Sequence, residues 1–575
     1  MNIDLNLKIG GAAGQGLQTT GMALAKTLKK SGLHVFATQY YLSRVRGGHN
    51  TFQIRISDSP VFAMTETVDI LLALDAESIT QHMSELKDGV VIVDSDVIDV
   101  KENADAIFHV PLLKIAKDVS GDKIYSNSVS MGAVIALLCL ELPNLESILK
   151  AAFKKKGEQI VQNNINAVRA GYNYVKENYP GGCKFEVSDS GEKENMMLVN
   201  GNEAVGLGAL AAGVQFLAAY PMTPSTGVMT YVAANADKFN VVVEQAEDEI
   251  AALNMILGAS FAGARSMTTT SGGGFSLMTE ALGLASITET PAVIFLGQRP
   301  GPATGLPTMT EQGDLQFALN AAQGEFPRCI LAPGTPEECF YLTAEAFNIA
   351  DKYQIPVFVM SDQYLADSLF TCPSFDTSKV LIERHLLSDQ ELRTKKEEYK
   401  RYKFTPLGIS PRALPGQEGV LVVADSDEHD EFGHINEDPV NRIKMNDKRM
   451  NKLEVLREEM PDAKVYGNLN ASISLIGWGS TFGPLAEVVD ILNDEGKSVN
   501  LVHFTHIHPI PVEATRKLLV KAKKTVCVEN NFTGQFSRHL KVDAGINITE
   551  QILRYDGKPF SPEFIISALK EKGVI

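Results

Sequence analysis

The sequence between Ala218 and Pro302 decides the fold of this chain. It reads AAYPMTPSTG over residues 218–227, VVVEQAEDEIAALNMILGASFAGARSMTTTSGGG over 241–274 and TPAVIFLGQRPGP over 290–302. Apolar strands alternate here with helical stretches rich in Ala and Leu, an order that predicts a parallel α/β sheet. Each predicted strand ends in polar residues, and open α/β sheets bind ligands at the carboxyl ends of their strands. The segment therefore predicts a ligand site at one edge of a sheet.

A similar pattern precedes this segment and predicts another α/β unit over residues 1–180. Its alternation of strands and helices indicates a mainly parallel sheet, and a helical stretch from Glu146 to Asn178 closes it. The expected strands are Leu5–Ile9, His34–Ala37, Thr51–Ile56, Ile70–Leu74 and Val90–Val93, and the first expected helix is Leu17–Lys30.

The remaining sequence divides by composition. At 575 residues the chain is too long for one core, and about three or four domains are expected. A polar, glycine-bearing linker is predicted over 181–199 and an α/β unit over 200–370. Residues 371–465 form a connecting region with Pro and paired charges, and a third α/β unit covers 466–575. The predicted fold class is multi-domain α/β.

Charge and hydropathy exclude several classes of protein. The 53 basic and 70 acidic residues leave a net charge of −17, which argues against a surface for nucleic acid or anionic membranes. The start, MNIDLNLKIGG, lacks a basic region followed by an apolar one. No apolar run approaches the ~20 residues of a membrane span. A cytoplasmic enzyme is expected.

Cysteine spacing argues against a cluster or zinc site in this chain. No two cysteines form a CxxC pair, and the closest two are ten residues apart, whereas thiolate metal sites show tight spacing. Reduced, mostly buried thiols are expected. The six are Cys139, Cys183, Cys329, Cys339, Cys372 and Cys527.

Several spaced motifs together resemble one enzyme family. The YPMTPS turn at 220–225, the glutamate opening the next helix and QRPGPATGLPT at 298–308 resemble the pyrimidine-binding domain of thiamine-diphosphate-dependent 2-oxoacid:ferredoxin oxidoreductases. Residues 1–180 resemble the γ module of the same enzymes, fused ahead of an α module. The third unit resembles the C-terminal domain of the transketolase-like superfamily. The fused arrangement resembles the 2-oxoglutarate synthase type.

Glu249 is the candidate catalytic residue that the resemblance implies. Thiamine diphosphate becomes its own base when a carboxylic acid lies beside the pyrimidine N1′. Glu249 begins a predicted helix, as in the family. The alternative is that Glu249, like Glu247 and Asp248, merely complements the helix dipole.

Thr223 and Arg299 are the candidate substrate-binding residues. Thr223 lies between two prolines that fix the backbone, so its hydroxyl can be presented to a carboxylate or carbonyl. Arg299 follows an apolar strand, and its guanidinium suits a 2-oxoacid carboxylate. The alternatives are a helix cap by Thr223 or Ser225 and a salt bridge of Arg299 at a domain boundary. The TTTSGGG stretch, 268–274, is expected to be a flexible loop rich in N–H donors. The predicted cofactor contacts are Tyr220, Pro221, Glu249, Thr270, Ser271 and Gly272.

The glycine-rich loop GGAAGQG, residues 10–16, does not match the pattern of an NAD-binding site. Its glycines follow GxxGxG rather than GxGxxG, and the second strand ends Ala37-Thr38-Gln39 without an acid for a ribose. A helix N-terminus after glycines can still bind phosphate. By resemblance the module contributes to coenzyme A handling, whereas the alternative for SRVRGGH is a positive loop at a module interface. The residues concerned are Gly14, Gly16, Arg44, Arg46, Gly47, Gly48 and His49.

The histidines of HFTHIHP raise the question of a metal site. His506 and His508 would share a face of a strand, but no acid or cysteine is suitably spaced to join them, and the family uses this stretch structurally. No metal is predicted in this chain. His429 and His434, in an acidic loop, are expected to be solvated.

One missing motif indicates that the active site is shared. The diphosphate and Mg²⁺ of thiamine enzymes are held by a GDG turn, and no GDG occurs in the sequence. The resemblance therefore implies a partner β subunit that supplies the diphosphate pocket, Mg²⁺ and a [4Fe–4S] cluster, in an (αβ)2 hetero-oligomer. It implies the conversion of a 2-oxoacid, coenzyme A and oxidised ferredoxin to acyl-CoA, CO2 and reduced ferredoxin.

More than one substrate and more than one class of function are compatible with the sequence. 2-Oxoglutarate ranks first because of the fused arrangement, and pyruvate or branched-chain 2-oxoacids remain open. A scaffold subunit without catalytic activity is the alternative from another class.

Overall fold

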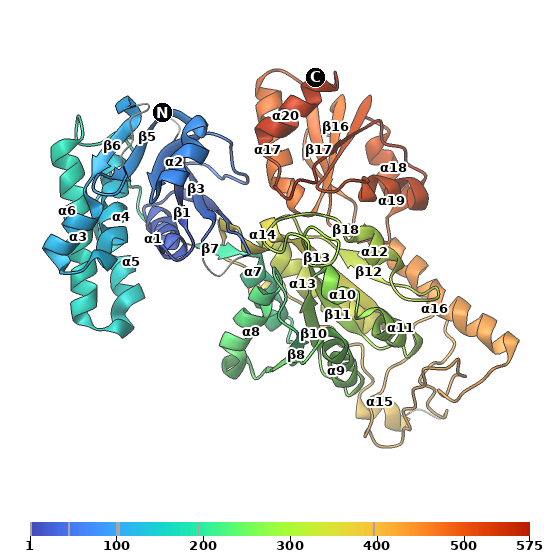
Figure 1. Ribbon diagram of the computed structural model, residues 1–575. Coiled ribbons are helices and arrows are strands. Elements are labelled where there is room, and N and C mark those ends of the chain that lie inside the picture. Colours follow the sequence, from blue (N-terminus) through green and yellow to red (C-terminus); the bar gives the residue numbers. More distant parts are fainter. Residues whose placement is uncertain (1–2, 44–46, 99–103, 194, 395–396) are drawn as a thin grey trace. The chain divides into compact units, whose positions relative to one another are not determined.

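The computed structural model describes residues 3–43, 47–98, 104–193, 195–394 and 397–575. These residues form two compact units, coloured along the sequence in Figure 1. The first contains Met1–Val199 with Ser368–Ser374 and Ser561–Glu563, and the second contains the rest of the chain. Among the described residues, no helix is both long and apolar enough to cross a membrane.

The first unit is built on an eight-stranded mixed sheet. The sheet was predicted to be mainly parallel, and this prediction is wrong for half of it: β1 pairs in parallel with β4, but β3 is antiparallel to both β1 and β2. The reason is local, because β2 and β3 follow each other without a helix that would return the chain to the same direction. The strand order is β6 (Ile107–Val110), β5 (Leu86–Asp94), β4 (Val68–Ala73), β1 (Asp4–Ala12), β3 (His49–Ser57), β2 (His34–Tyr40), β14 (Leu369–Pro373) and β7 (Met196–Asn200).

Helices cover this sheet, and α4 and α6 pack along each other (Figure 1). The predicted helix Glu146–Asn178 is two helices, because a short 3₁₀ turn and Gly157, at a φ of 104°, interrupt it. The predicted first helix is confirmed. The helices are α1 (Leu17–Lys30), α2 (Ala76–His82), α3 (Leu112–Ser120), α4 (Ser126–Leu137), α5 (Pro143–Phe153) and α6 (Glu158–Asn178).

The predicted linker residues belong largely to the first unit. Val187 is buried in its core, and its N–H donates to the carbonyl of Leu138. Residues Met196–Asn200 form β7. The predicted domain boundaries themselves stay predictions.

The second unit contains the seven-stranded sheet that the quoted segment predicts. The prediction of parallel strands is confirmed, since the pairs β8–β9, β8–β10, β10–β11, β11–β13 and β12–β13 are all parallel and only β18 is antiparallel, to β12. The order is β18 (His506–His508), β12 (Cys329–Leu331), β13 (Pro356–Asp362), β11 (Ala292–Gln298), β10 (Ser266–Thr270), β8 (Phe216–Ala219) and β9 (Val242–Gln245). Its helices include α7 (Gly201–Ala211), α8 (Thr226–Phe239), α9 (Glu249–Phe261), α11 (Thr279–Ile287) and α13 (Pro336–Tyr353).

A five-stranded sheet in the second unit is formed by the end of the chain. Three of its ladders are parallel, and β15 at one edge is antiparallel to β17. The order is β15 (Lys464–Gly467), β17 (Val499–Phe504), β16 (Ile473–Trp478), β19 (Lys524–Glu529) and β20 (Glu550–Leu553). Its helices are α17 (Phe482–Asp494), α18 (Val512–Leu519), α19 (Gln535–Ala544) and α20 (Pro562–Glu571).

The connecting region is anchored by a buried charge cluster on α16 (Pro439–Glu459). The Nζ atom of Lys448 lies 2.5 Å from Oε1 of Glu289, and the Nζ atom of Lys452 contacts Oε2. Burial alone would raise the pKa of Glu289, but the charges of Lys448, Lys452 and Arg401 outweigh it and hold that pKa well below its usual range. A short helix, α15 (Asp389–Thr394), and irregular segments fill the rest of this region. His429 was expected to be solvated and is instead buried, with Nδ1 3.0 Å from the carbonyl of Asp427.

Two of the six thiols are not reduced. Cys139 and Cys183 form a disulfide, although they are 44 residues apart in the sequence. The expectation of reduced thiols is therefore wrong for this pair, because the packing of α4 against the following segment brings them together. The four other cysteines are buried and carry thiols, as expected.

Candidate active site

The predicted site residues gather at the carboxyl edge of four adjacent strands. The sheet order β11, β10, β8, β9 makes these strands neighbours, and each is followed directly by one of the polar segments singled out above. Tyr220 and Thr223 follow β8, Glu249 follows β9, Ser271 follows β10 and Arg299 follows β11. Because parallel strands end at the same edge, these side chains converge on one region.

Glu249 is buried at the start of α9, with 4% of its surface exposed. The carboxylate that caps this helix belongs to Asp248, which accepts a hydrogen bond of 2.7 Å from the N–H of Ala251. The capping role therefore falls to the neighbouring acid. The carboxylate of Glu249 lies buried at the edge of the sheet. An acid that only complemented the helix dipole would have no reason to be buried there.

Gly274 lets the Glu249 carboxylate approach the end of β10. A Cβ atom on Gly274 would lie 2.6 Å from Oε1 of Glu249 and 2.3 Å from Oγ1 of Thr270. Similarly, a Cβ atom on Gly272 would lie 2.5 Å from both carboxylate oxygens of Asp314. The two glycines are therefore required for the close packing of acids and hydroxyls around this turn.

The predicted flexible loop at 268–274 is ordered and buried. Thr268 and Thr270 belong to β10, and Gly272–Phe275 forms the short helix α10. The hydroxyl oxygens of Thr268 and Ser271 are buried and make no hydrogen bond with the described residues. Strand and helix residues, rather than an adaptable loop, thus form a buried wall that carries unsatisfied hydroxyls.

Arg299 and Thr223 are in direct contact. The Nη1 atom of Arg299 donates a hydrogen bond of 2.7 Å to the carbonyl oxygen of Thr223. Burial lowers the pKa of Arg299, and the charge of Asp314 opposes this effect. The guanidinium of Arg299 nevertheless stays charged, because arginine is not deprotonated in proteins. Ser225 stands at the N-cap of α8 but makes no side-chain cap, and its hydroxyl donates to the carbonyl of Met222 at 2.7 Å.

Asp314 is a site residue that the sequence analysis missed. Burial, with a smaller contribution from Glu311, raises the pKa of Asp314 to about 7, while Arg299 acts to lower it. Its Oδ2 atom is buried without a hydrogen-bond partner among the described residues. The only signal in the sequence is an acid shortly after the GPATGLPT stretch, at the start of the helix α12 (Leu315–Asn320). A residue in that position is more often read as a helix cap.

The segment that carries Asp314 is held by the part of the second unit built on the five-stranded sheet, called the five-stranded lobe below. The side chain of Gln312 donates to the carbonyl of Trp478 at 2.8 Å and accepts from the N–H of Asn530 at 3.0 Å. The N–H of Asp314 in turn donates to Oε1 of Gln298, at 3.0 Å. The position of Asp314 is thus fixed by the five-stranded lobe, through Gln312, and by Gln298 at the end of β11.

Tyr220 and Pro221 complete the predicted set at the outer rim. Tyr220 is 40% exposed, and Pro221 is half-buried. They are therefore accessible next to the buried acids and hydroxyls. All the residues predicted to contact cofactor and substrate in this unit lie along one sheet edge.

The candidate residues of the first unit also converge. Gly14 and Gly16 have φ angles of 92° and 79° before α1, and Gly47 and Gly48 precede β3. The register of β1 and β3 pairs Ala12 with His49, so both glycine segments lie at the same end of the sheet. The predicted Arg44 and Arg46 lie outside the described residues.

A histidine pair beside these glycines was not predicted. The Nε2 atoms of His49 and His82 lie 2.7 Å apart, and Nδ1 of His82 lies 2.9 Å from Oε1 of Glu85. Strand register is what brings His49 to this position, and no local sequence pattern indicates it.

Comparison with known proteins identifies the family. Residues 6–174 match the family described as pyruvate ferredoxin/flavodoxin oxidoreductase, and residues 207–448 match its thiamine-diphosphate-binding domain. The α subunit of a 2-oxoacid:ferredoxin oxidoreductase from a Sulfolobus species is 34% identical over 98% of this chain and 96% of its own length. The chain belongs to the 2-oxoacid:ferredoxin oxidoreductase family.

Further members of the family agree with this assignment. The 2-oxoglutarate oxidoreductase subunit KorA of Mycobacterium tuberculosis is 28% identical over 93% of this chain and 86% of its own length. A solved 2-oxoglutarate:ferredoxin oxidoreductase from Magnetococcus marinus, with 2-oxoglutarate, coenzyme A and succinyl-CoA bound, matches with a TM-score of 0.93 and 33% identity over 99% of both chains. The predicted family, fold class and enzyme class are confirmed, and the chain contains a thiamine-diphosphate-binding domain.

Proposed function

We propose that this chain is the α subunit of a 2-oxoacid:ferredoxin oxidoreductase that acts on 2-oxoglutarate, with coenzyme A as acyl acceptor and ferredoxin as electron acceptor. The observation that carries the proposal is the buried Glu249 carboxylate beside Gly274 and Thr270, on the same sheet edge as Arg299. The products are succinyl-CoA, CO2 and reduced ferredoxin. Pyruvate and branched-chain 2-oxoacids are the alternative substrates.

The residues at this edge fit the pyrimidine end of thiamine diphosphate. A polar aromatic ring needs partners for its ring nitrogens and amino group. The buried hydroxyl of Ser271 and the Oδ2 atom of Asp314 have no hydrogen-bond partner in the part of the chain that the structure describes. The three glycines of α10 present only backbone at this edge of the sheet. Tyr220, Pro221, Thr270 and Gly272 complete the predicted contacts.

The chain's own residues have separate tasks. When bound, thiamine diphosphate supplies the carbanion that attacks the ketone carbon of the 2-oxoacid. Glu249 would exchange a proton with a pyrimidine nitrogen of the bound cofactor through a carboxyl oxygen, and its burial would strengthen that interaction. Arg299 binds the substrate carboxylate through its guanidinium, and its bond to the Thr223 carbonyl fixes the side chain that does so. The Thr223 hydroxyl is the second substrate contact.

The preference for 2-oxoglutarate rests on the relatives. The protein from Magnetococcus marinus has 2-oxoglutarate and succinyl-CoA bound, and the relative from Mycobacterium tuberculosis is named for 2-oxoglutarate. Both match this chain over more than nine-tenths of its length. The same activity is therefore the first to test here.

The rest of the active site belongs to other subunits in this proposal. The relatives are named α subunits, and the sequence lacks the GDG motif. A β subunit supplies the diphosphate pocket, Mg²⁺ and the [4Fe–4S] cluster that passes electrons to ferredoxin, in an (αβ)2 assembly in the cytoplasm. Residues 1–180 act as the γ-type module, and Gly14, Gly16, Gly47 and Gly48, with Arg44 and Arg46, contribute to the binding of coenzyme A.

The test is co-expression of this chain with the product of its neighbouring gene, followed by an assay of viologen reduction that depends on coenzyme A. A panel of 2-oxoacids is compared in the wild type and in the variants Glu249→Gln and Glu247→Gln. Glu247 is the matched control, because it is an exposed acid two residues away. Activity with 2-oxoglutarate that is lost in Glu249→Gln and kept in Glu247→Gln supports the proposal. Full activity of Glu249→Gln in the assembled enzyme supports the scaffold alternative.

A further inference from the structure

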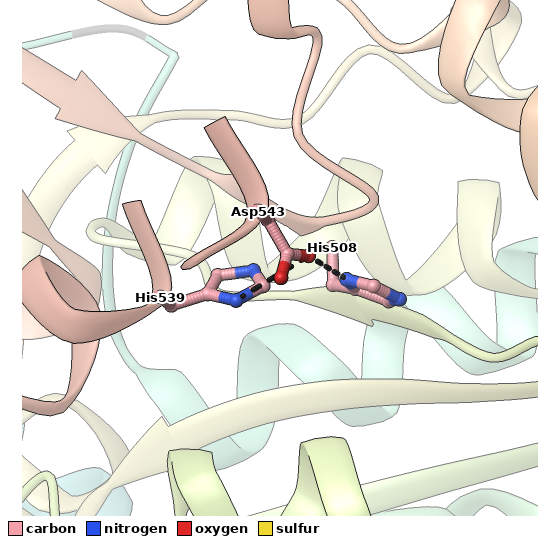
Figure 2. A group of neighbouring side chains, drawn as sticks. All are labelled: His508, His539 and Asp543. Atoms are coloured by element: carbon pink, nitrogen blue, oxygen red, sulfur yellow. Dashed lines mark ion pairs between the residues drawn. The ribbon is translucent and has the colours of Figure 1, made fainter. Parts of the chain in front are cut away.

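Two histidines and an aspartate from different elements of the second unit point their donor atoms at one another. His508 ends β18, and His539 and Asp543 lie one turn apart on α19. Figure 2 shows the Asp543 carboxylate between the two imidazole rings. One ligand atom from each residue lies within 4.8 Å of the other two. No acid near the HFTHIHP histidines in the sequence is spaced to join them, and Asp543 follows them by more than thirty residues.

The hydrogen bond on the far side of His539 fixes which nitrogen faces the cluster. Its Nε2 atom lies 3.0 Å from the carbonyl oxygen of Ile507, which can only accept. Nε2 therefore carries the proton, and Nδ1 turns toward Oδ2 of Asp543. The ring of His539 is buried, with 4% of its side chain exposed. In the neutral ring, two electron-pair donors face each other: Nδ1 of His539 and the Asp543 carboxylate.

The distances within the cluster favour a shared cation over direct hydrogen bonds. Oδ2 of Asp543 lies 3.4 Å from Nδ1 of His508 and 3.6 Å from Nδ1 of His539. Hydrogen bonds between such groups are shorter, at about 2.7–3.2 Å. Ligands bound tetrahedrally at 2.0–2.2 Å from one ion lie about 3.4 Å apart. In addition, the Nδ1 atom of His508 is buried and makes no hydrogen bond with the described residues.

We propose that His508, His539 and Asp543 bind a divalent transition-metal ion, with zinc as the first choice. Two imidazole nitrogens and one carboxylate oxygen, with a remaining position for water, form a donor set that zinc accepts. The carbonyl of Ile507 plays the outer-shell role that orients a metal-bound imidazole. Because the ligand atoms lie within 4.8 Å of one another, binding requires His508 to move by at most about 1.4 Å. This ring is on the accessible side of the cluster, with 13% of its side chain exposed.

A nearby cation does not prevent this site. The charge of Arg457 reaches both His539 and Asp543. The Nη1 atom of Arg457 donates to both carboxylate oxygens of Glu454, at 2.9 and 2.8 Å, so that this cation has a counter-ion of its own within α16. The net charge of the cluster is then set by Asp543, and a divalent ion gains from it.

The ion would connect two layers of the second unit. His508 belongs to the edge strand of the seven-stranded sheet, whereas α19 belongs to the five-stranded lobe. That lobe also holds the segment between Arg299 and Asp314 through Gln312. The role that the structure supports for the metal is thus a clamp between lobe and sheet, apart from the residues that contact substrate.

The test compares zinc content in the full chain and three variants. Each protein is stripped with a chelator, dialysed against zinc and then against metal-free buffer, and measured by plasma mass spectrometry. Asp543→Asn and His508→Gln remove ligands. His506→Gln is the matched control, because this histidine lies on the same strand but pairs with Glu345, 3.0 Å away. Zinc-edge anomalous diffraction from wild-type crystals supplies a readout that requires no variant.

We expect about one zinc ion per wild-type and per His506→Gln chain. The two ligand variants should bind at least about 10- to 100-fold more weakly, the loss that even outer-shell substitutions cause. The anomalous peak should lie between the three side chains. Wild-type protein without stoichiometric zinc, equal zinc in the wild type and both ligand variants, or an anomalous peak elsewhere would each overturn the proposal.

Discussion

Replacing Gly274 with alanine should displace the Glu249 carboxylate while leaving the chain folded. The new Cβ atom would lie 2.3 Å from Oγ1 of Thr270 and 2.6 Å from Oε1 of Glu249. To restore ordinary contact, each of these atoms must retreat by about 1 Å, and a misplacement of about 1 Å at a reacting centre costs on the order of 10²-fold. We therefore expect kcat/KM for the 2-oxoacid to fall about 100-fold in the assembled enzyme.

The matched control is Gly273→Ala, one residue earlier in the same short helix. A Cβ atom there meets only the carbonyl of Ala303, at 3.7 Å. Both substitutions gain the same helix propensity of about 1 kcal/mol, so that the difference between them reports the displacement of Glu249. The Gly274 variant is expected to lose about 1–3 kcal/mol of stability through overpacking, measured by urea denaturation. If both variants reduce viologen at the same rate, the position of the Glu249 carboxylate does not limit the reaction and the reasoning is refuted.

Three other predictions test the charges of the second unit. Arg299→Lys should raise KM for the 2-oxoacid about tenfold while changing kcat less, because a planar fork becomes a point charge; steady-state kinetics with an unchanged KM would contradict this. Burial raises the pKa of Asp314 from 3.8 to about 7, so the folded chain binds this proton more tightly than the unfolded chain and loses stability as the pH rises from about 4 to about 7. Asp314→Asn should remove this loss and stabilise the free chain at pH 8 by up to roughly 4 kcal/mol. If the free energy of unfolding, measured with urea, changes equally between pH 5 and pH 8 in the wild type and the variant, the prediction is wrong. Lys452→Met should destabilise the chain by about 3 kcal/mol in the same assay, because it leaves Glu289 with one lysine partner fewer in a buried position; no loss would mean that the cluster is dispensable.

The elements that carry the site could be predicted because their signals are local. The strand that ends before Tyr220 and the helix that begins at Glu249 are each marked by an apolar run and a following turn or acid. Their convergence followed from one rule, that parallel strands end at the same edge. The rule requires only that the strands be neighbours, and the order β11, β10, β8, β9 satisfies it.

Residues that depend on distant contacts escaped prediction. Asp314 reaches the site because Gln312 is bound to the lobe formed by the end of the chain, more than 150 residues later. Asp543 meets His508 only through the packing of α19 against β18. The disulfide between Cys139 and Cys183 is a further case, since its spacing matches no local pattern.

The mixed sheet of the first unit shows a different limit. The period of a strand indicates which residues are buried but not the direction of its neighbour. The alternation of strands and helices therefore predicts a mainly parallel sheet, whereas β2 and β3 are antiparallel. The predicted helical stretch Glu146–Asn178 is interrupted in the same way, because Gly157 has a positive φ and a new helix begins at Glu158. A single glycine within a helical pattern is often tolerated.

Strand β14 has a consequence for any attempt to separate the two halves of this chain. It comes from residues 369–373 but lies in the first sheet between β2 and β7. A gene fragment ending after Val199 would encode a sheet with one strand missing near its edge, so that β2 exposes unpaired backbone groups and β7 loses the neighbour that holds it. Such a truncated product is expected to aggregate or to recruit a strand from elsewhere, whereas the same fragment supplied with a peptide of the β14 sequence should be rescued. The first unit takes this strand from a segment that follows the start of the second unit in the sequence, so a cut between the two units removes part of the first.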